Sequence, residues 1–139
     1  MKILACLDIS SQAQPVLEKS LQIALCQKNA EVIFYSLAED LIDYGADGVP
    51  PELSVQIKER SRANLDSAAR EAENKGVPAR TVMESGSSPA DAILTFAEKE
   101  AVDLIVVGSK AKTGLDRFLI GSVASKVVAH SKCSVLVLR

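Results

Sequence analysis

The sequence feature that most constrains the fold is the run DLIVVG at residues 103–108. Leucine, isoleucine and valine occupy both alternating positions, so a strand formed here is apolar on both of its faces. Strands of that kind occur in the interior of parallel sheets, where helices cover both faces. The run therefore predicts a central parallel strand of an α/β fold.

Other short runs rich in apolar or β-branched residues predict four more strands. They are KILACL (2–7), EVIFYSL (31–37), ARTVME (79–84) and SVLVLR (134–139). Helical patterns separate them, over about 12–28, 52–75, 85–100 and 122–131. Strict alternation of strands and helices predicts an open, doubly wound parallel sheet with right-handed crossovers, Rossmann-like, in a single domain over 1–139.

The helical segments also predict which residues are buried. Ser10 or Ser11 is expected to cap the first helix, and the loop YGADGVPP at 44–51 is expected to be flexible. The predicted apolar stripe of the first helix is Leu17, Leu21 and Leu25. That of the second helix is Leu53, Ile57, Leu65, Ala69 and Ala72.

Composition excludes several functional classes. The net charge of −2 argues against a dedicated nucleic-acid binder, which needs a basic excess. No apolar run reaches the roughly 18 residues of a membrane span, and the start lacks the layout of a signal peptide. A cytoplasmic protein is therefore expected.

The cysteines and the histidine do not suggest a metal or catalytic site. Cys6, Cys26 and Cys133 lie far apart with no CxxC, and they are expected to be small buried apolar residues. The only histidine, His130, lies at a helix end and is expected at the surface. Zinc binding and histidine-dependent nucleophilic catalysis are therefore not predicted.

Ligands of open α/β sheets bind at the carboxyl ends of strands, where the strand order reverses. This rule directs attention to Asp8, after the first strand, and to the loop GSKAKTGLDRFLIGS at 108–122. The loop is not a Walker A motif, because Leu115 stands where that motif has lysine. It is not the dinucleotide fingerprint GxGxxG, because Lys110 takes the place of the second glycine.

The loop nevertheless has the parts of an anion site. Gly108 lets a ligand approach without a Cβ, and Gly121-Ser122 open a helix whose first amides attract phosphate. Asp8 could accept a hydrogen bond from a ribose hydroxyl or help to hold a metal. Three cations could neutralise phosphate: Lys110, Lys112 and Arg117. An equally simple interpretation is that the glycines only turn the chain, Gly-Ser only caps a helix, and the cations are solvated.

Three stretches resemble the universal stress protein family over essentially the whole chain. They are KILACLDIS, SGSSPADAILTFAEKEAVDLIVVGSK and GSKAKTGLDRFLIGSVASKVVAHSKCSVLVLR. ATP-binding members carry G-x2-G-x9-G-[ST] after the fourth strand. Gly108, Gly121 and Ser122 match this pattern with the nine-residue spacing intact, whereas Ala111 replaces the second glycine.

The resemblance implies five parallel strands in the order 3-2-1-4-5 and a bound adenine nucleotide, ATP or else ADP or AMP. Three phosphates beside Asp8 would favour a divalent cation, Mg²⁺ or Mn²⁺. Asp8 looks like the acidic residue near the ribose, with any contact to the metal indirect, and Leu37 like the position whose backbone meets adenine. Cys6, Leu7 and Val107 match the apolar lining. Positions matching the phosphate cradle are Gly108, Ala111, Gly121, Ser122 and Val123, beside Lys110, while Ala124 stands where some binders have a hydroxyl.

Ala111 is the main departure from the family pattern. If its backbone needs a positive φ, alanine costs on the order of 1 kcal/mol. A loss of about 1.4 kcal/mol weakens binding roughly tenfold, which leaves a micromolar site weaker but present. A methyl group that points at the phosphate would cost more.

Three functional hypotheses follow. The first is a nucleotide-binding stress or signalling module with at most slow hydrolysis, because Asp116 is the only acid in the loop. The second is a nucleotide-free protein that acts through its partners, as a homodimer formed along the terminal strand 134–139, which the resemblance implies. The third is an ATP-splitting ligase or nucleotidyl transferase, which is disfavoured because LDISSQ lacks the glycines of that signature loop.

Overall fold

The computed structural model of the protein describes residues 1–8, 10–39, 51–109 and 120–139. Its elements alternate along the chain as the sequence predicts. The strands are β1 (Lys2–Cys6), β2 (Glu31–Glu39), β3 (Ala79–Gly86), β4 (Leu104–Gly108) and β5 (Ser134–Leu138). The helices are α1 (Ala13–Leu25), α2 (Pro51–Asn74), α3 (Pro89–Lys99) and α4 (Ser122–His130).

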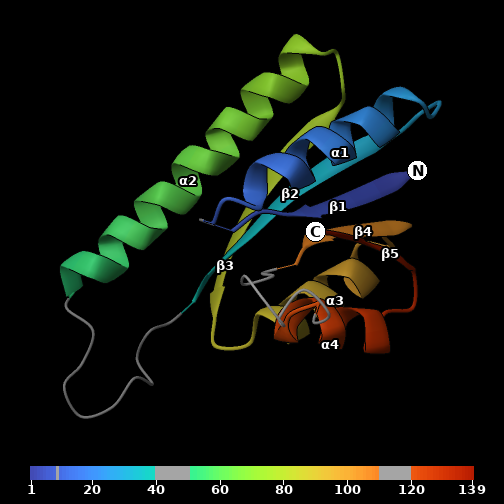
Figure 1. Cartoon of the computed structure of the whole chain (residues 1–139). Helices are drawn as coiled ribbons and strands as arrows, with labels where there is room; N and C mark the ends of the chain where they lie inside the picture. Colours follow the sequence, from blue (N-terminus) through green and yellow to red (C-terminus); the bar gives the residue numbers. More distant parts are fainter. Residues whose placement is uncertain (9, 40–50, 110–119) are drawn as a thin grey trace.

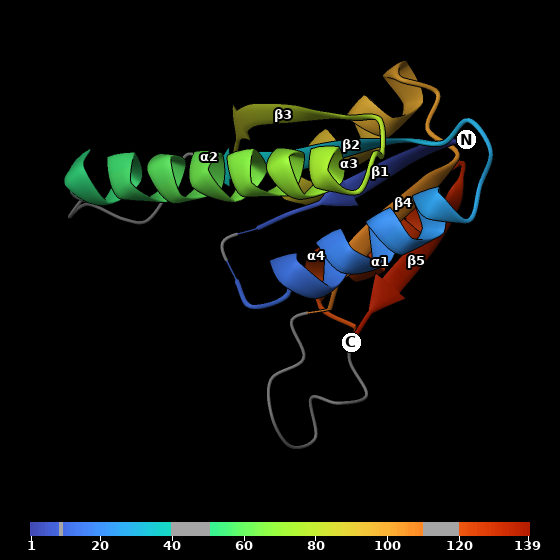
Figure 2. The ribbon, with the colours of Figure 1, turned by 90° about the horizontal axis from the view of Figure 1, so that it is seen from above.

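The five strands form one parallel sheet in the order β3-β2-β1-β4-β5, which confirms the predicted topology. Helices α1 and α2 cover one face of the sheet and α3 and α4 cover the other (Figure 1). Seen from above, β3 and β5 lie at opposite edges of the sheet (Figure 2). The chain thus builds outward from β1 to β3 and then returns to β4, on the other side of β1.

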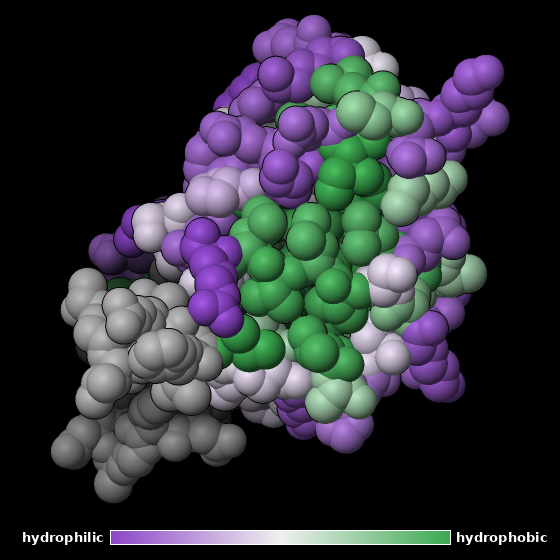
Figure 3. Space-filling view, turned by 45° about the vertical axis from the view of Figure 1, so that its right-hand side comes forward, coloured by the Kyte–Doolittle hydropathy of each residue, from purple (hydrophilic) through white to green (hydrophobic). Residues whose placement is uncertain are grey.

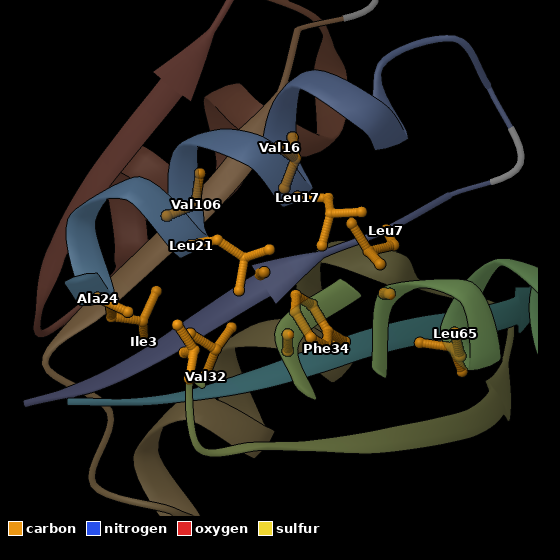
Figure 4. Packing of buried hydrophobic residues seen from close by; sticks show 14 of the residues in the cluster. Ile3, Leu7, Val16, Leu17, Leu21, Ala24, Val32, Phe34, Leu65 and Val106 are labelled. Carbon is orange, nitrogen blue, oxygen red and sulfur yellow. The ribbon is translucent and has the colours of Figure 1, made fainter. Parts of the chain in front are cut away.

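The centre of the sheet is buried on both faces, as DLIVVG predicts. Ile105 and Val106 of β4 are fully buried and face opposite sides of the sheet. On the side of α1 and α2, Phe34 and Val106 pack among leucines of both helices (Figure 4). On the other side, Leu4, Ile33 and Ile105 pack against α3 and α4. None of the helices in the described residues is both long and apolar enough to cross a membrane.

The buried stripe of α1 differs from the prediction at its end. Leu17 and Leu21 are buried, but Leu25 is 57% exposed and Ala24 takes its place in the core. Repeated steps of four residues drift around a helix of 3.6 residues per turn, so a buried stripe must include steps of three. The predicted cap was also wrong: the N-cap is Gln12, and the Ser10 hydroxyl accepts a bond from the Gln12 amide.

The buried stripe of α2 also differs from the prediction at one position. Ala68 is fully buried where Ala69 was predicted, whereas Leu65 and Ala72 are buried as expected. Leu53 is 44% exposed, because the first turns of α2 project beyond the ends of the strands (Figure 1). Cys26, expected to be buried, is exposed just after α1. The predicted loop at 44–51 lies outside the described residues as far as residue 50, and Pro51 already belongs to α2.

Leu21 and Leu25 provide a matched test of the α1 packing. Leu21→Ala should lower the free energy of unfolding by about 2–5 kcal/mol, because the side chain is 1% exposed and its removal leaves a cavity. Leu25→Ala should change it by no more than about 0.5 kcal/mol, because that side chain is in solvent. Urea denaturation of both variants measures the difference. Equal losses would contradict this packing.

Candidate functional site

A cleft opens at the carboxyl ends of β1, β2 and β4, beside the first turn of α4. Its volume is about 480 Å³, within the range of small-molecule sites. The cleft lies at the point where the strand order reverses, which is where open α/β sheets bind ligands. It is lined by Cys6, Leu7, Asp8, Tyr35, Leu37, Pro89, Ile93, Val107, Gly108, Ile120, Gly121, Ser122, Val123 and Ala124.

Ten of the twelve residues predicted from sequence line this cleft together. They are Cys6, Leu7, Asp8, Leu37, Val107, Gly108, Gly121, Ser122, Val123 and Ala124. The other two, Lys110 and Ala111, lie outside the described residues, as do Lys112 and Arg117. The effect of alanine at position 111 on the backbone therefore stays a prediction.

Four lining residues were missed: Tyr35, Pro89, Ile93 and Ile120. A sequence signal existed for one of them. Tyr35 is two residues before Leu37 on the same strand and therefore lies on the same face of the sheet. Ile93 lies one helical turn after Pro89, but only the packing of α3 shows that this turn borders the cleft.

Asp8 is held at the end of β1 by contacts with the neighbouring helices. Its carboxylate oxygen Oδ1 accepts hydrogen bonds from the Ser10 amide, at 2.9 Å, and from the Ser10 hydroxyl. Its main-chain carbonyl accepts a bond of 3.2 Å from the side-chain amide of Asn64 on α2. Such local bonds order a carboxylate before any ligand arrives, so Asp8 is presented to the cleft in a defined position.

Cys6 lines the cleft as a neutral thiol. Burial raises the pKa of this thiol well above its ordinary value of 9.0, and the negative charge of Asp8 raises it further. The thiolate is the reactive form of cysteine, so Cys6 is a poor nucleophile at neutral pH. Its contribution to the cleft is apolar surface.

The β2 wall of the cleft contains Tyr35, which is 1% exposed. Its ring packs against Phe96 with centroids 5.0 Å apart and a tilt of 42°. Its hydroxyl donates a 2.6 Å hydrogen bond to Oε2 of Glu84. Burial, and then the bond to Glu84, raise the pKa of this phenol above its usual range. Tyr35 is therefore a fixed, neutral side chain.

The opposite end of the cleft is the amino-terminal end of α4. Gly121 is the N-cap, with φ of 80° and ψ of 155°, a conformation that residues with a Cβ rarely adopt. The first intrahelical bond runs from the Ser125 amide to the Gly121 carbonyl, at 3.0 Å. Amides of the preceding residues have no acceptor within the helix and, with the helix dipole, attract an anion.

Gly108 has a second role that its sequence pattern does not reveal. A Cβ at this position would lie 2.7 Å from Cβ of Gln12, at the start of α1. Glycine therefore allows α1 to approach the end of β4 as well as leaving the cleft open. The sequence suggested only the approach of a ligand.

The part of the chain that the structure describes contains no group of three or more His, Cys, Asp or Glu side chains placed to bind a metal ion. His130 ends α4 and is exposed, as predicted. Its helix begins at Ser122, so roughly 12 Å of helix separates the imidazole-bearing residue from the cleft.

Comparison with known sequences identifies a family. The sequence model of the Universal stress protein family matches residues 1–139. A universal stress protein of Methanocaldococcus jannaschii, MJ0531, is 42% identical over 97 residues, covering 66% of this chain and 56% of that protein. The universal stress protein YxiE of Bacillus subtilis is 32% identical over 122 residues, covering 88% of this chain and 82% of that protein.

Solved structures share the fold along the whole chain. The M. jannaschii protein MJ0577 superposes with a TM-score of 0.79 at 28% identity, covering 99% of this chain and 94% of that one. A universal stress protein in complex with cAMP has a TM-score of 0.70 at 23% identity, covering 100% and 96%. An Arabidopsis thaliana family protein with AMP bound has a TM-score of 0.69 at 18% identity, covering 99% and 90%.

The close approach of Gly108 and Gln12 gives a testable prediction. Gly108→Ala should lower the free energy of unfolding by about 1–3 kcal/mol, because the added methyl overlaps Cβ of Gln12. Gln12→Gly removes that Cβ at a cap position where glycine is tolerated. The double variant should therefore recover part of the loss in a double-mutant cycle measured by urea denaturation. Strict additivity of the two changes would contradict the assigned contact.

Proposed function

The chain belongs to the universal stress protein family, and from this premise we propose that its cleft binds an adenine nucleotide, with ATP as the ligand. The observation that carries the proposal is the convergence of a cleft of about 480 Å³, part of whose wall is apolar, with the amino-terminal end of α4. An apolar wall suits a base, and helix amides suit a phosphate. In this proposal the nucleotide sets the state of a stress or signalling module in the cytoplasm.

The lining suggests how the nucleotide lies. The phosphates would contact the amides that follow Gly121 and the Ser122 hydroxyl, where the helix dipole favours negative charge. The ribose would lie near Asp8. The base would lie between Val107 and Leu37, with the main chain of Leu37 at its edge. Two proteins of the same fold hold cAMP and AMP, which agrees with this proposal.

A divalent cation would be held mainly by the phosphates, with Asp8 contacting it through a water molecule. Magnesium commonly uses one or two carboxylates together with substrate phosphates, so a single carboxylate at this position fits the ion. The bound ion would neutralise phosphate charge in the cleft.

Hydrolysis is proposed to be slow or absent. Asp8 is the only carboxylate among the described lining residues, and the described part of the cleft has no histidine to act as a general base. Cys6 is a neutral thiol, and the Tyr35 hydroxyl stays protonated and donates a hydrogen bond to Glu84. These side chains bind and position a ligand but do not activate a water molecule.

The β5 edge supports a second function, association of two copies of this chain. Val135, Leu136, Val137 and Leu138 are partly exposed, and β5 ends the sheet. An apolar area covers the side of the molecule that carries this edge (Figure 3). Exposed apolar edge strands pair readily with another strand, so this edge fits a homodimer. A nucleotide-free protein acting through partner contacts would use the same surface.

Alanine substitutions at two glycines with positive φ test whether a loss of nucleotide binding comes from the cleft or from backbone strain in general. Gly121→Ala should weaken binding of ATP with Mg²⁺ at least about tenfold, because the helix amides shift away from the phosphates. Gly76→Ala is the matched control: its φ is 67°, no atom lies within 4 Å of the added Cβ, and it is not among the residues lining the cleft. It should leave binding unchanged.

Calorimetric titration measures both variants beside the wild type and Ala111→Gly. A micromolar dissociation constant of the wild type supports the proposal, and tighter binding by Ala111→Gly would assign a cost to that methyl group. No binding of ATP, ADP or AMP by either the wild type or Ala111→Gly would overturn the nucleotide function.

The β5 edge predicts a concentration-dependent dimer. Leu136→Lys should shift the protein to monomer, because a charge would be buried at the edge contact. Val55→Lys places the same charge at a 54% exposed apolar position on α2 and should not affect association. Sedimentation velocity at micromolar concentrations measures both, with thermal melts as the control for folding. A wild type that sediments only as monomer would contradict the dimer.

A further inference from the structure

Tyr35 of β2 lines the cleft and is hydrogen-bonded to Glu84 of the neighbouring strand β3, which is not itself among the lining residues. The Tyr35 ring lines the cleft and is fixed by Phe96, while its hydroxyl lies 2.6 Å from Oε2 of Glu84. Glu84 itself is exposed, so one hydrogen bond separates a solvent-accessible carboxylate from a buried lining residue. The pair has no role in the function proposed above.

The strand register places Glu84 beside the cleft. Leu37, which lines the cleft, is paired directly with Glu84 in the parallel ladder of β2 and β3. Directly paired residues of neighbouring strands point to the same face, and the strands are about 4.8 Å apart. The Glu84 side chain is therefore the neighbour of the Leu37 side chain on the face that forms the cleft.

This corner of the cleft accepts hydrogen bonds. The Tyr35 proton is already donated to Glu84, so the phenol oxygen has only lone pairs left to offer. The carboxylate of Glu84 is an acceptor at both oxygens. The nearby cation Arg80 is paired with Glu100, and none of the ion pairs among the described residues involves Glu84.

We propose that Glu84, positioned by Tyr35, accepts a hydrogen bond from an exocyclic amino group of the bound base and thereby makes the cleft prefer an amino-bearing base to one with a carbonyl in the same place. The inference rests on the proposed nucleotide function and assigns a determinant of its specificity. A carbonyl oxygen at that position would face the carboxylate with lone pairs on both sides and no proton between them. Glu84 is the specificity-determining residue and Tyr35 the positioning residue.

The same pair fixes the direction in which a nucleotide can bind. A triphosphate placed at the Glu84 corner would be repelled by the carboxylate, whereas the amino-terminal end of α4 attracts it. An adenine nucleotide has its donor group and its negative charge at opposite ends. It therefore matches the charge distribution of the cleft in one orientation only.

The test compares ATP with ITP, which carries a carbonyl oxygen in place of the 6-amino group. Dissociation constants of both are measured by calorimetry for the wild type, Glu84→Gln, Glu84→Ala and Tyr35→Phe, and again with Ala111→Gly in each. Glu73→Gln is the matched control, because it removes the same charge from an exposed position on α2. Backbone contacts at Leu37 contribute to the ratio of the ITP and ATP dissociation constants in every variant. The change in this ratio between the wild type and a Glu84 variant therefore measures the contribution of Glu84.

The wild type is expected to bind ATP at least about tenfold more tightly than ITP, the effect of one hydrogen bond to a charged acceptor. Glu84→Gln and Glu84→Ala should reduce this ratio to about threefold or less, Tyr35→Phe should give an intermediate ratio, and Glu73→Gln should retain the full ratio. ATP binding with an unchanged ratio in the Glu84 variants overturns this inference and leaves the nucleotide function standing. If neither nucleotide binds in either background, both are overturned.

Discussion

The pairing of β1 with β4 is the contact on which the rest of the structure depends. Both strands are buried at their centres, and their side chains point alternately into two separate apolar cores. Burial on both faces requires helices on both faces, and right-handed crossovers then send successive helices to opposite sides only when the strand order reverses. The reversal between β1 and β4 separates the loops that follow them. That separation is the cleft, so the site is a consequence of the same apolar patterning that stabilises the sheet.

Some residues that line the cleft also pack against the segment before α1, α1 itself or α2, so the same contacts affect the stability of the fold and the geometry of the cleft. The amino-terminal end of α1 approaches β4 so closely that Gly108 cannot carry a Cβ. Asp8 is fixed by Ser10 and Asn64, which belong to the segment before α1 and to α2. Residues that line the cleft are thus held by helices on the opposite face of the sheet. A substitution in α1 or α2 can therefore change the geometry of the cleft without touching a ligand.

Apolar periodicity predicted a doubly wound parallel sheet, and the reversal of strand order in such sheets pointed to Asp8 and to the loop after β4. The strand order and most of the lining residues came from the resemblance to the universal stress protein family. Prediction from the sequence failed where tertiary geometry decides between adjacent positions. The choice of Ala68 over Ala69, or of Ala24 over Leu25, depends on the angle at which each helix lies on the sheet, and side-chain spacing alone does not determine that angle.

The place of Glu84 beside Leu37 could not be predicted from the sequence for a related reason. Glu84 belongs to the edge strand β3, and its place beside Leu37 depends on the register of a parallel pair joined through α2. Parallel register is set by the length and packing of the crossover rather than by a turn motif. A motif within one continuous segment can be recognised in the sequence, whereas a contact made by residues of separate strands depends on the register of the sheet. In the binding mode proposed above, the phosphates would contact a glycine-containing segment, whereas contacts to the base would come from separate strands. A substitution at Glu84 would then change base preference in this chain without altering the glycine-containing segment.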